Sequence, residues 1–269
     1  MSAGAPAYET EVQVLPWASV VLARNPSPMT LEGTNTWLLG HDRLVVVDPG
    51  DDDEAHLRAV VDAVAARGAA VAEVVLTHGH PDHSGGARRF RELTGAPVRA
   101  LDPRHRHGGE GLTAGEVVAA GDVPLQVVLT PGHTADSVCL LTDDAVLTGD
   151  TVLGRGTTVV AWPDGDLGSY LASLRALREL GPRTVLPGHG PVLPDAGAVA
   201  TAYLEHREQR LDQVRGALAA AGVDPAAADP GALDALVEMV VEQVYADVDR
   251  AVWPAARLSV RAQLEHLRG

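Results

Sequence analysis

The string Thr77-His78-Gly79-His80-Pro81-Asp82-His83 constrains this chain more than any other feature, because it places four metal-capable side chains within six residues. It follows an apolar run, Val74–Leu76, and leads into a helical pattern after Ser84-Gly85-Gly86. A strand end that opens into a loop lets such side chains converge. Imidazole and carboxylate ligands without a thiolate suit zinc, with iron or manganese as alternatives. The string therefore predicts a metal site at the end of a strand.

Three further metal-capable residues have the same setting, since each lies at a predicted strand end beside glycine or proline. The segments are Pro131-Gly132-His133-Thr134, Thr148-Gly149-Asp150 and Pro187-Gly188-His189-Gly190. Taken singly, each is an ordinary turn sequence. Together with the first string they predict one centre with two metal ions, whose ligands are His78, His80, Asp82, His83, His133, Asp150 and His189.

From Val12 to about Val192 the sequence alternates short β-branched runs with turns and amphipathic helices. The predicted strands are Val20–Ala23, Thr36–Leu39, Leu44–Asp48, Val71–Thr77, Leu125–Leu129, Val138–Leu141, Ala145–Leu147 and Thr184–Leu186. The predicted helices are Glu54–Ala66, Gly86–Leu93 and Ser169–Leu180. This mixture predicts an α/β fold in which sheets are layered with helices.

After Pro194 the strand patterns end and helical patterns replace them. One long helix is predicted over Ala196–Ala220, a second starts at Asp229–Pro230, and a third follows Trp253–Pro254. We therefore expect a catalytic domain over residues 1–198 and a small helical domain over residues 199–269.

Composition narrows the classes of function. Cys139 is the only cysteine, so no internal disulfide is possible, and neither a signal peptide nor a membrane-spanning run is evident. We expect a cytoplasmic protein that is not embedded in a membrane. The net charge is −15, and every basic side chain apart from histidine is arginine. An acidic surface repels phosphate backbones unless a local basic groove or a metal offsets it, which argues against large nucleic acids as ligands.

The order of the motifs, a His-x-His-x-Asp-His string followed by a separate His, Asp and His, resembles the metallo-β-lactamase fold family. Asp48-Pro49-Gly50 is similar to the early strand end of that family. The resemblance implies a four-layer αβ/βα sandwich with the metals at one edge. It also implies that Asp150 bridges two metal ions and that Asp48 supports the ligands. The remaining ligands would divide into His78, His80 and His133 for one ion and Asp82, His83 and His189 for the other.

Such a centre implies hydrolysis. Two metal ions about 3.5–4 Å apart can share a hydroxide, lower its pKa towards neutrality and polarise the bond that it attacks. Asp82 could in addition orient the nucleophile or pass a proton to the leaving group.

A closer resemblance rests on Asn25-Pro26, on Gly33-Thr34-Asn35-Thr36-Trp37 and on the segment from Gly149 to Thr158. With the helical tail, these residues resemble the lactamase-β-like endoribonuclease subgroup, which also contains fungal acyl-carrier-protein thioesterases. The tail resembles the small winged-helix-like domain of that subgroup, although the chain stops at Gly269, where wing strands would follow.

The leading interpretation is a di-zinc hydrolase of an ester-type bond, with a small or carrier-bound acyl thioester favoured as substrate. The alternatives are an endoribonuclease selective for single strands, a non-catalytic binding module with structural metals, and an iron oxygenase. The tail from Val199 to Gly269 carries seven arginines against eleven acidic residues, which favours the acyl substrate over RNA.

Several residues keep two interpretations. The segment Gly33–Thr36 is either a turn that enters a strand or a loop on the substrate side. Arg155 and Thr157 follow the bridging aspartate and either reach a substrate or pack within a loop. His105 and His107 form either a basic loop beside the cleft or a solvated run. The remaining predictions are a buried Cys139 and a surface position for His41, His56, His206 and His266.

Overall fold

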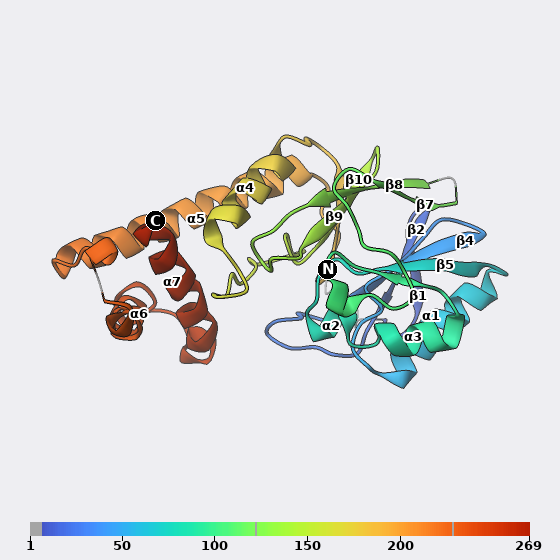
Figure 1. Ribbon diagram of the computed structural model, residues 1–269, viewed down its shortest axis with the longest axis horizontal. Coiled ribbons are helices and arrows are strands. Elements are labelled where there is room, and N and C mark those ends of the chain that lie inside the picture. The colour runs from blue at the N-terminus through green and yellow to red at the C-terminus, as the bar shows by residue number, and fades with distance from the viewer. Residues whose placement is uncertain (1–6, 122, 228) are drawn as a thin grey trace, which may run out of the picture. The chain divides into compact units, whose positions relative to one another are not determined.

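The computed structural model describes residues 7–121, 123–227 and 229–269. The chain divides into two compact units, and each is described by itself below. The first unit combines Met1–Leu129, Asp136–Gly156 and Arg183–Asp195, and the second combines Thr130–Ala135, Thr157–Pro182 and Ala196–Gly269. Figure 1 shows most of the strands in the blue-to-green part of the chain and the long helices in the yellow-to-red part.

The first sheet has six strands in sequence order. Its strands are β1 (Glu11–Leu15), β2 (Ala18–Leu22), β3 (Asn35–Leu39), β4 (Arg43–Val47), β5 (Ala70–Val75) and β6 (Val98–Arg99). The pairs from β1 to β4 are antiparallel, whereas β4, β5 and β6 are parallel. The helix between β4 and β5 supplies the crossover that a parallel pair requires.

The second sheet has five strands in the order β11-β10-β9-β8-β7. Its strands are β7 (Val117–Ala120), β8 (Val123–Leu129), β9 (Val138–Leu141), β10 (Ala145–Gly149) and β11 (Thr184–Pro187). Only β10 and β11 are parallel to each other, so the residues that follow these two strands lie at the same edge of the sheet.

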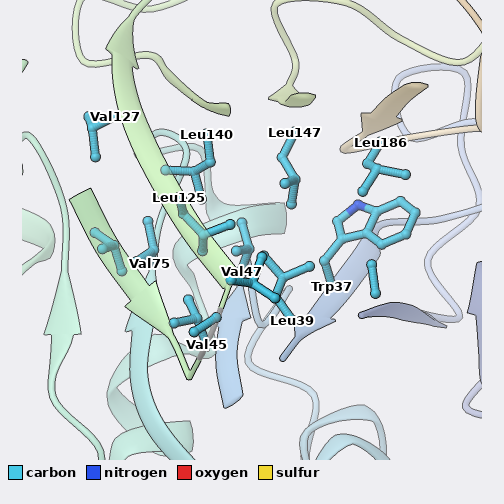
Figure 2. Packing of buried hydrophobic residues seen from close by; sticks show 14 of the residues in the cluster. Trp37, Leu39, Val45, Val47, Val75, Leu125, Val127, Leu140, Leu147 and Leu186 are labelled. Atoms are coloured by element: carbon cyan, nitrogen blue, oxygen red, sulfur yellow. The ribbon is translucent and has the colours of Figure 1, made fainter. Parts of the chain in front are cut away.

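The two sheets of the first unit enclose a hydrophobic core (Figure 2). Trp37 and Val47 of the first sheet pack in one cluster with Leu125, Leu140 and Leu147 of the second. The indole Nε1 of Trp37 donates a hydrogen bond to the carbonyl of Pro187 at 3.0 Å, which satisfies its polar atom inside the core. This core fixes the two sheets against each other, and with them the strand ends that carry the predicted ligands.

Helices cover the other face of the first sheet. The helices α1 (Glu54–Ala66) and α3 (Ala87–Thr94) contribute Leu57 and Phe90 to a second buried cluster, which also contains Leu38 and Val46 of the sheet. Asp53 caps α1, because its side chain accepts the backbone N–H of Ala55 at 2.9 Å. Two short helical segments, α2 (Pro81–Ser84) and η1 (Pro103–His105), lie in the loops.

The second unit is helical. It contains α4 (Leu167–Arg178), α5 (Ala196–Ala220), α6 (Leu233–Val244), α7 (Trp253–Arg268) and the short η2 (Pro225–Ala227), η3 (Pro230–Ala232) and η4 (Arg250–Val252). Val214, Val240 and Val260, from three different helices, share a buried cluster. Within residues 196–227 and 229–269 there is no strand, so wing strands are absent from the described part of the tail.

Most of the predicted elements are present with small shifts at their ends. The helices over Glu54–Ala66 and Ala196–Ala220 and the strand over Val138–Leu141 have the predicted bounds. The strands β1, β6 and β7 were not predicted. Among the helices described, none is long and apolar enough to cross a membrane. The division into domains at residue 198 remains a prediction.

Candidate metal centre

Most of the predicted ligands follow strands of the first unit. The string from His78 to His83 comes directly after β5, Asp150 follows β10, and His189 follows β11. We call His78, His80, Asp82, His83, Asp150 and His189 the strand-end cluster. Asp48 follows β4, the neighbour of β5 in the first sheet. The strands therefore bring residues that are more than 100 positions apart to one place.

The atoms of this cluster are close enough to share metal ions. Nε2 of His83 lies 3.1 Å from Nε2 of His189, and these two nitrogens lie 3.3 and 3.4 Å from Oδ1 of Asp150. Oδ2 of Asp82 lies 3.2 Å from Nε2 of His189. One ligand atom each from Asp82, His83 and His189 lie within 4.8 Å of one another, as do those of His78, His83 and Asp150. The rings of His78 and His80 are 4.7 Å apart.

Charge is balanced within the cluster. Burial alone would lower the pKa of His83, but the carboxylates of Asp150 and Asp48 raise it well above its usual value. Burial opposes the charge of His189 as well, and Asp150 and Asp82 raise the pKa of His189 to about 9. Burial would raise the pKa of Asp150, yet His83 and His189 hold it well below its usual range. Two nitrogens 3.1 Å apart beside carboxylates form an environment that favours a cation, whether a proton or a metal ion.

The histidine tautomers suit metal binding. Nδ1 of His83 is 2.8 Å from Oδ2 of Asp48, and Nδ1 of His189 is 3.1 Å from the carbonyl oxygen of Gly33. Nδ1 of His78 is 3.1 Å from Oγ1 of Thr77. A ring that donates its Nδ1–H to an oxygen keeps the lone pair of Nε2 for a metal ion. The surroundings therefore select the Nε2 ligand form for each of these rings.

His133 belongs to the second unit, where the same pattern recurs. Its Nδ1 lies 2.8 Å from the carbonyl oxygen of Val159, and the residue is buried with an exposed fraction of 7%. The preceding Gly132 has a φ of 137°, and a Cβ at this position would lie 2.3 Å from Cα of Tyr170. Glycine is therefore required beside His133.

Asp48 and Thr77 form the support of the cluster. Oδ1 of Asp48 accepts the backbone N–H of Thr77 at 2.8 Å, and Oδ2 accepts the Thr77 hydroxyl at 2.6 Å in addition to the ring of His83. The backbone of Asp48 has a φ of 54°, a left-handed conformation that aspartate tolerates better than most residues. Asp48 therefore links the ends of β4 and β5 and orients His83.

The segment Gly33–Thr36 clamps the loop that carries His189. Nδ2 of Asn35 donates hydrogen bonds to the carbonyls of Pro187 and Gly190 at 3.0 and 2.9 Å, and Gly33 accepts from His189. The segment enters β3, as the turn interpretation predicted. It also holds the loop of a candidate ligand, which the sequence did not predict.

Gly188 leaves the room that the cluster needs. A Cβ on Gly188 would lie 2.7 Å from Oδ1 of Asp150 and 2.7 Å from Cε1 of His83. A side chain at this position would therefore push against two candidate ligands, which explains glycine immediately before His189.

The other candidates have different surroundings. Arg155 forms an ion pair with Glu32, and Thr157 lines a cavity in the second unit. His105 is partly buried. It lies close to the metal-binding string, since a Cβ on Gly79 would be 2.4 Å from its Nε2. Asp102, His105 and Asp136 could also group around an ion, but the carboxylate of Asp102 is already bound to Arg104.

The prediction that His56 lies at the surface is wrong. His56 is buried, and its Nε2 lies 2.9 Å from Oγ1 of Thr36. Burial lowers the pKa of His56 to about 4, so the ring is neutral. The sequence could not reveal this, because the partner lies 20 residues away on β3. Cys139 is buried, as predicted.

Comparison with known proteins agrees with this geometry. Residues 29–189 match the model of the metallo-beta-lactamase superfamily, and residues 237–268 match the beta-lactamase associated winged helix domain. The chain belongs to the metallo-β-lactamase superfamily. The predicted fold, two mixed sheets with flanking helices and a helical winged-helix-type region at the C-terminus, is confirmed.

Individual relatives are similar to this chain over most of its length and not only at the ligand motifs. The chain is 32% identical to the beta-lactamase-like protein 2 homolog of Caenorhabditis elegans over 92% of its own length and 82% of that protein. It is 37% identical to an atrochrysone carboxyl ACP thioesterase of Aspergillus fumigatus, over 76% of its own length and 66% of the relative. A solved β-lactamase domain protein from Burkholderia ambifaria superposes with a TM-score of 0.77 at 24% identity, over 99% of this chain and 90% of that one.

Apart from Asp48, the residues that position the ligands were not identified from the sequence. Thr77, Asn35 and Gly188 carry no metal-binding group, and their role depends on contacts between distant segments. Only their place directly beside ligand motifs or strand ends offered a signal.

Proposed function

We propose that the chain is a metal-dependent hydrolase that uses two divalent ions, zinc first, to cleave an ester-type bond in a small or carrier-bound acyl thioester. The observation that carries the proposal is the pattern of oriented histidines. His78, His83, His189 and His133 each direct Nδ1 towards an oxygen, which leaves Nε2 of each ring for a metal ion.

The donor set also fits two ions better than one. A closed structural zinc site needs four ligands, whereas this chain offers seven candidates without a thiolate. We assign His78, His80 and His133 to one ion and Asp82, His83 and His189 to the other, with Asp150 between them. The group of Asp82, His83 and His189 supports this division, because its ligand atoms lie within 4.8 Å of one another.

When bound, two such ions supply a nucleophile from water near neutral pH and polarise the bond to be cleaved. The chain supplies orientation and proton transfer. Asp48 holds the ring of His83, and Gly33 holds the ring of His189. Asp82 is more exposed than the other candidate ligands of the second ion, with a quarter of its side chain accessible. Its carboxylate can therefore accept a proton from water and pass it to the leaving group.

Two observations favour an acyl substrate over RNA. The thioesterase of Aspergillus fumigatus is a relative at 37% identity, although the chain spans only about two thirds of that protein. The helical tail is net negative, with seven arginines against eleven acidic residues from Val199 to Gly269. A polynucleotide needs many phosphate contacts, whereas a compact acyl substrate needs few.

The test is a substrate panel measured with and without chelator. It contains acyl thioesters, lactones, bis-p-nitrophenyl phosphate and a short single-stranded RNA, each at low and at physiological salt. We expect thioester cleavage that chelator abolishes. Metal-dependent RNA cleavage at physiological salt, unmatched by any ester and lost in Asp82→Ala, would contradict the proposed substrate class.

A further inference from the structure

A cavity of about 180 Å³ lies within the second unit. Its wall combines the segment Thr157–Val159 with residues of α5 and the start of α7. The charged or titratable side chains of the wall other than Tyr245 are His206, Arg207 and Arg210. Among the described residues that line it there is no carboxylate. We call this space the α5 cavity.

Arg207 is the most unusual member of this wall, because its guanidinium is buried and no described residue provides an opposite charge beside it. The residue has an exposed fraction of 4%. One terminal nitrogen donates to the carbonyl of Thr158, and the guanidinium carbon lies 5.2 Å from the centre of the Tyr170 ring. Among the described residues, its Nε has no hydrogen-bond partner, and none of the carboxylates forms an ion pair with the side chain. A buried cation in this state is costly unless an anion accompanies it.

His206 and Arg210 add donors beside Arg207. Nδ1 of His206 is buried and has no hydrogen-bond partner among the described residues. Burial lowers the pKa of His206, and the charges of Arg207 and Arg210 lower it further. Arg210 donates to Gln213 at 2.9 Å and lies over the Tyr245 ring. Among the described residues it has no ion pair. The guanidinium groups of Arg207 and Arg210 repel each other in the absence of an anion, and both favour the neutral form of His206.

The other arginines of the tail provide an internal comparison. Four arginines that do not line the α5 cavity form ion pairs with carboxylates: Arg215, Arg257, Arg261 and Arg268. The tail has more acidic than basic residues, so carboxylates are available. Among the described residues, Arg207, Arg210 and Arg250 have no ion pair with a carboxylate, and of these three only Arg207 and Arg210 line the cavity. The cationic wall is therefore a local exception in an acidic domain.

The size and place of the cavity limit its ligand. A volume of about 180 Å³ compares with about 30 Å³ for a water molecule in the liquid, which leaves room for one small anionic group with some water. Val159 contributes to the wall, and its carbonyl accepts from Nδ1 of His133 at 2.8 Å. The cavity thus shares a residue with the support of a candidate metal ligand.

We propose that the α5 cavity binds an oxyanion group of the acyl substrate, a phosphate or a carboxylate. Arg207, Arg210 and His206 donate to its oxygens. Because this inference rests on the proposed function for its substrate, binding and hydrolysis are tested separately.

The binding test titrates inorganic phosphate and, separately, acetate into the full chain labelled with ¹⁵N-histidine. The nitrogen signals of His206, assigned by their loss in His206→Gln, report occupancy of the cavity. We expect a saturating shift with at least one anion. Arg210→Gln and Ser259→Glu should raise the midpoint roughly tenfold or more, since the first removes a charge-assisted donor and the second adds a competing carboxylate. The anion that binds identifies the group.

Arg215→Gln is the matched control, because Arg215 lies on the same helix and pairs with Asp212. Its midpoint should stay within about twofold of the original. The thermal midpoint of each variant shows whether it folds. The proposal is overturned if neither anion shifts His206, or if the folded Arg210→Gln chain binds both anions as the original does.

The kinetic test compares two thioesters of the same acyl group, one with a phosphorylated thiol half and one with a short neutral thiol half. If the anion is phosphate, Arg210→Gln should raise KM for the phosphorylated thioester roughly tenfold and leave the neutral one unchanged. If it is carboxylate, the same pattern should appear with a dicarboxylic acyl group against its neutral counterpart. Equal effects on charged and neutral substrates would overturn the inference. If no thioester is hydrolysed but the His206 signals still shift with an anion, only the proposed function is refuted.

Discussion

The strand-end cluster and the α5 cavity both bury charged groups, but they neutralise them differently. In the cluster, His83 and His189 face Asp82 and Asp150, so the chain carries both signs of charge itself. In the α5 cavity, Arg207 has no carboxylate within ion-pair distance among the described residues. A site whose charges balance internally can fold before its metal arrives, whereas an unbalanced one depends on an external anion.

The largest expected effect tests the catalytic part of this comparison. Asp82→Ala should lower kcat on the order of 10³-fold with little change in KM, because it removes a metal ligand and a proton acceptor rather than substrate contacts. Steady-state kinetics on the best substrate of the panel measure this. Asp143→Ala, at an exposed position, serves as control and should have no effect. A loss confined to KM would show that Asp82 binds substrate instead.

The second effect is steric. Gly188→Ala should weaken metal binding roughly 10- to 100-fold, since its Cβ would lie 2.7 Å from Asp150 and His83. Gly216→Ala on α5 is the matched control, because a Cβ there meets nothing within 4 Å, and it should stabilise the chain by about 1 kcal/mol. Metal titration and thermal unfolding of both variants separate the effects. Unchanged metal affinity in Gly188→Ala would mean that the cluster adjusts freely.

A related effect concerns the support of the ligands. Asp48→Ala should weaken metal binding roughly 10- to 100-fold, because His83 loses its acceptor. It should also cost about 1–3 kcal/mol of unfolding free energy, since the buried N–H of Thr77 is left unsatisfied. Asp48→Asn retains one acceptor and a tolerated left-handed backbone, so its stability loss should be smaller. Equal metal affinity in all three chains would exclude the supporting role.

The smallest effect is a pH dependence of the metal-free chain. The pKa of His189 is about 9 in the folded chain and 6.5 in the unfolded chain. Its contribution to the free energy of unfolding is therefore complete below pH 6.5 and is lost as the pH rises through 9. The pKa of Asp150 is lowered on folding, so its carboxylate adds to the free energy of unfolding above pH 3.8, its unfolded value. That contribution is lost at lower pH. The thermal midpoint after chelation should fall on the order of 5 °C between pH 6.5 and 9. A flat profile would indicate that His189 stays neutral.

The two regions also differ in how far the sequence predicted them. The ligand motifs were visible because the metal-capable residues of the string are adjacent and the others lie at strand ends marked by glycine or proline. The helix over Ala196–Ala220 was predicted with its bounds, yet nothing in its pattern indicated that Arg207 is buried. His206 was predicted at the surface, but it lines the α5 cavity. Burial of a polar residue depends on the elements packed against it, and one local pattern does not report that.

The resemblance pointed to Asp48 as a support of the ligands, but the other contacts that orient them were beyond prediction for the same reason. Asn35 donates to the carbonyl of Gly190, which lies 155 residues further along the chain. Thr36 of β3 contacts His56 of α1. The short strand β6 and the edge strand β1 were missed because neither has a long apolar run. Local sequence therefore located the candidate ligands, whereas the supporting contacts required the fold.

Metal content tests the central claim most directly. The full chain, purified without added metal or chelator, is analysed by mass spectrometry for transition metals beside Asp150→Ala and His189→Ala. We expect about two metal ions per chain in the original protein and fewer in both variants, with circular dichroism largely unchanged because the ligands lie at strand ends outside the core. Hydrolytically active protein with only trace transition metal would contradict the account.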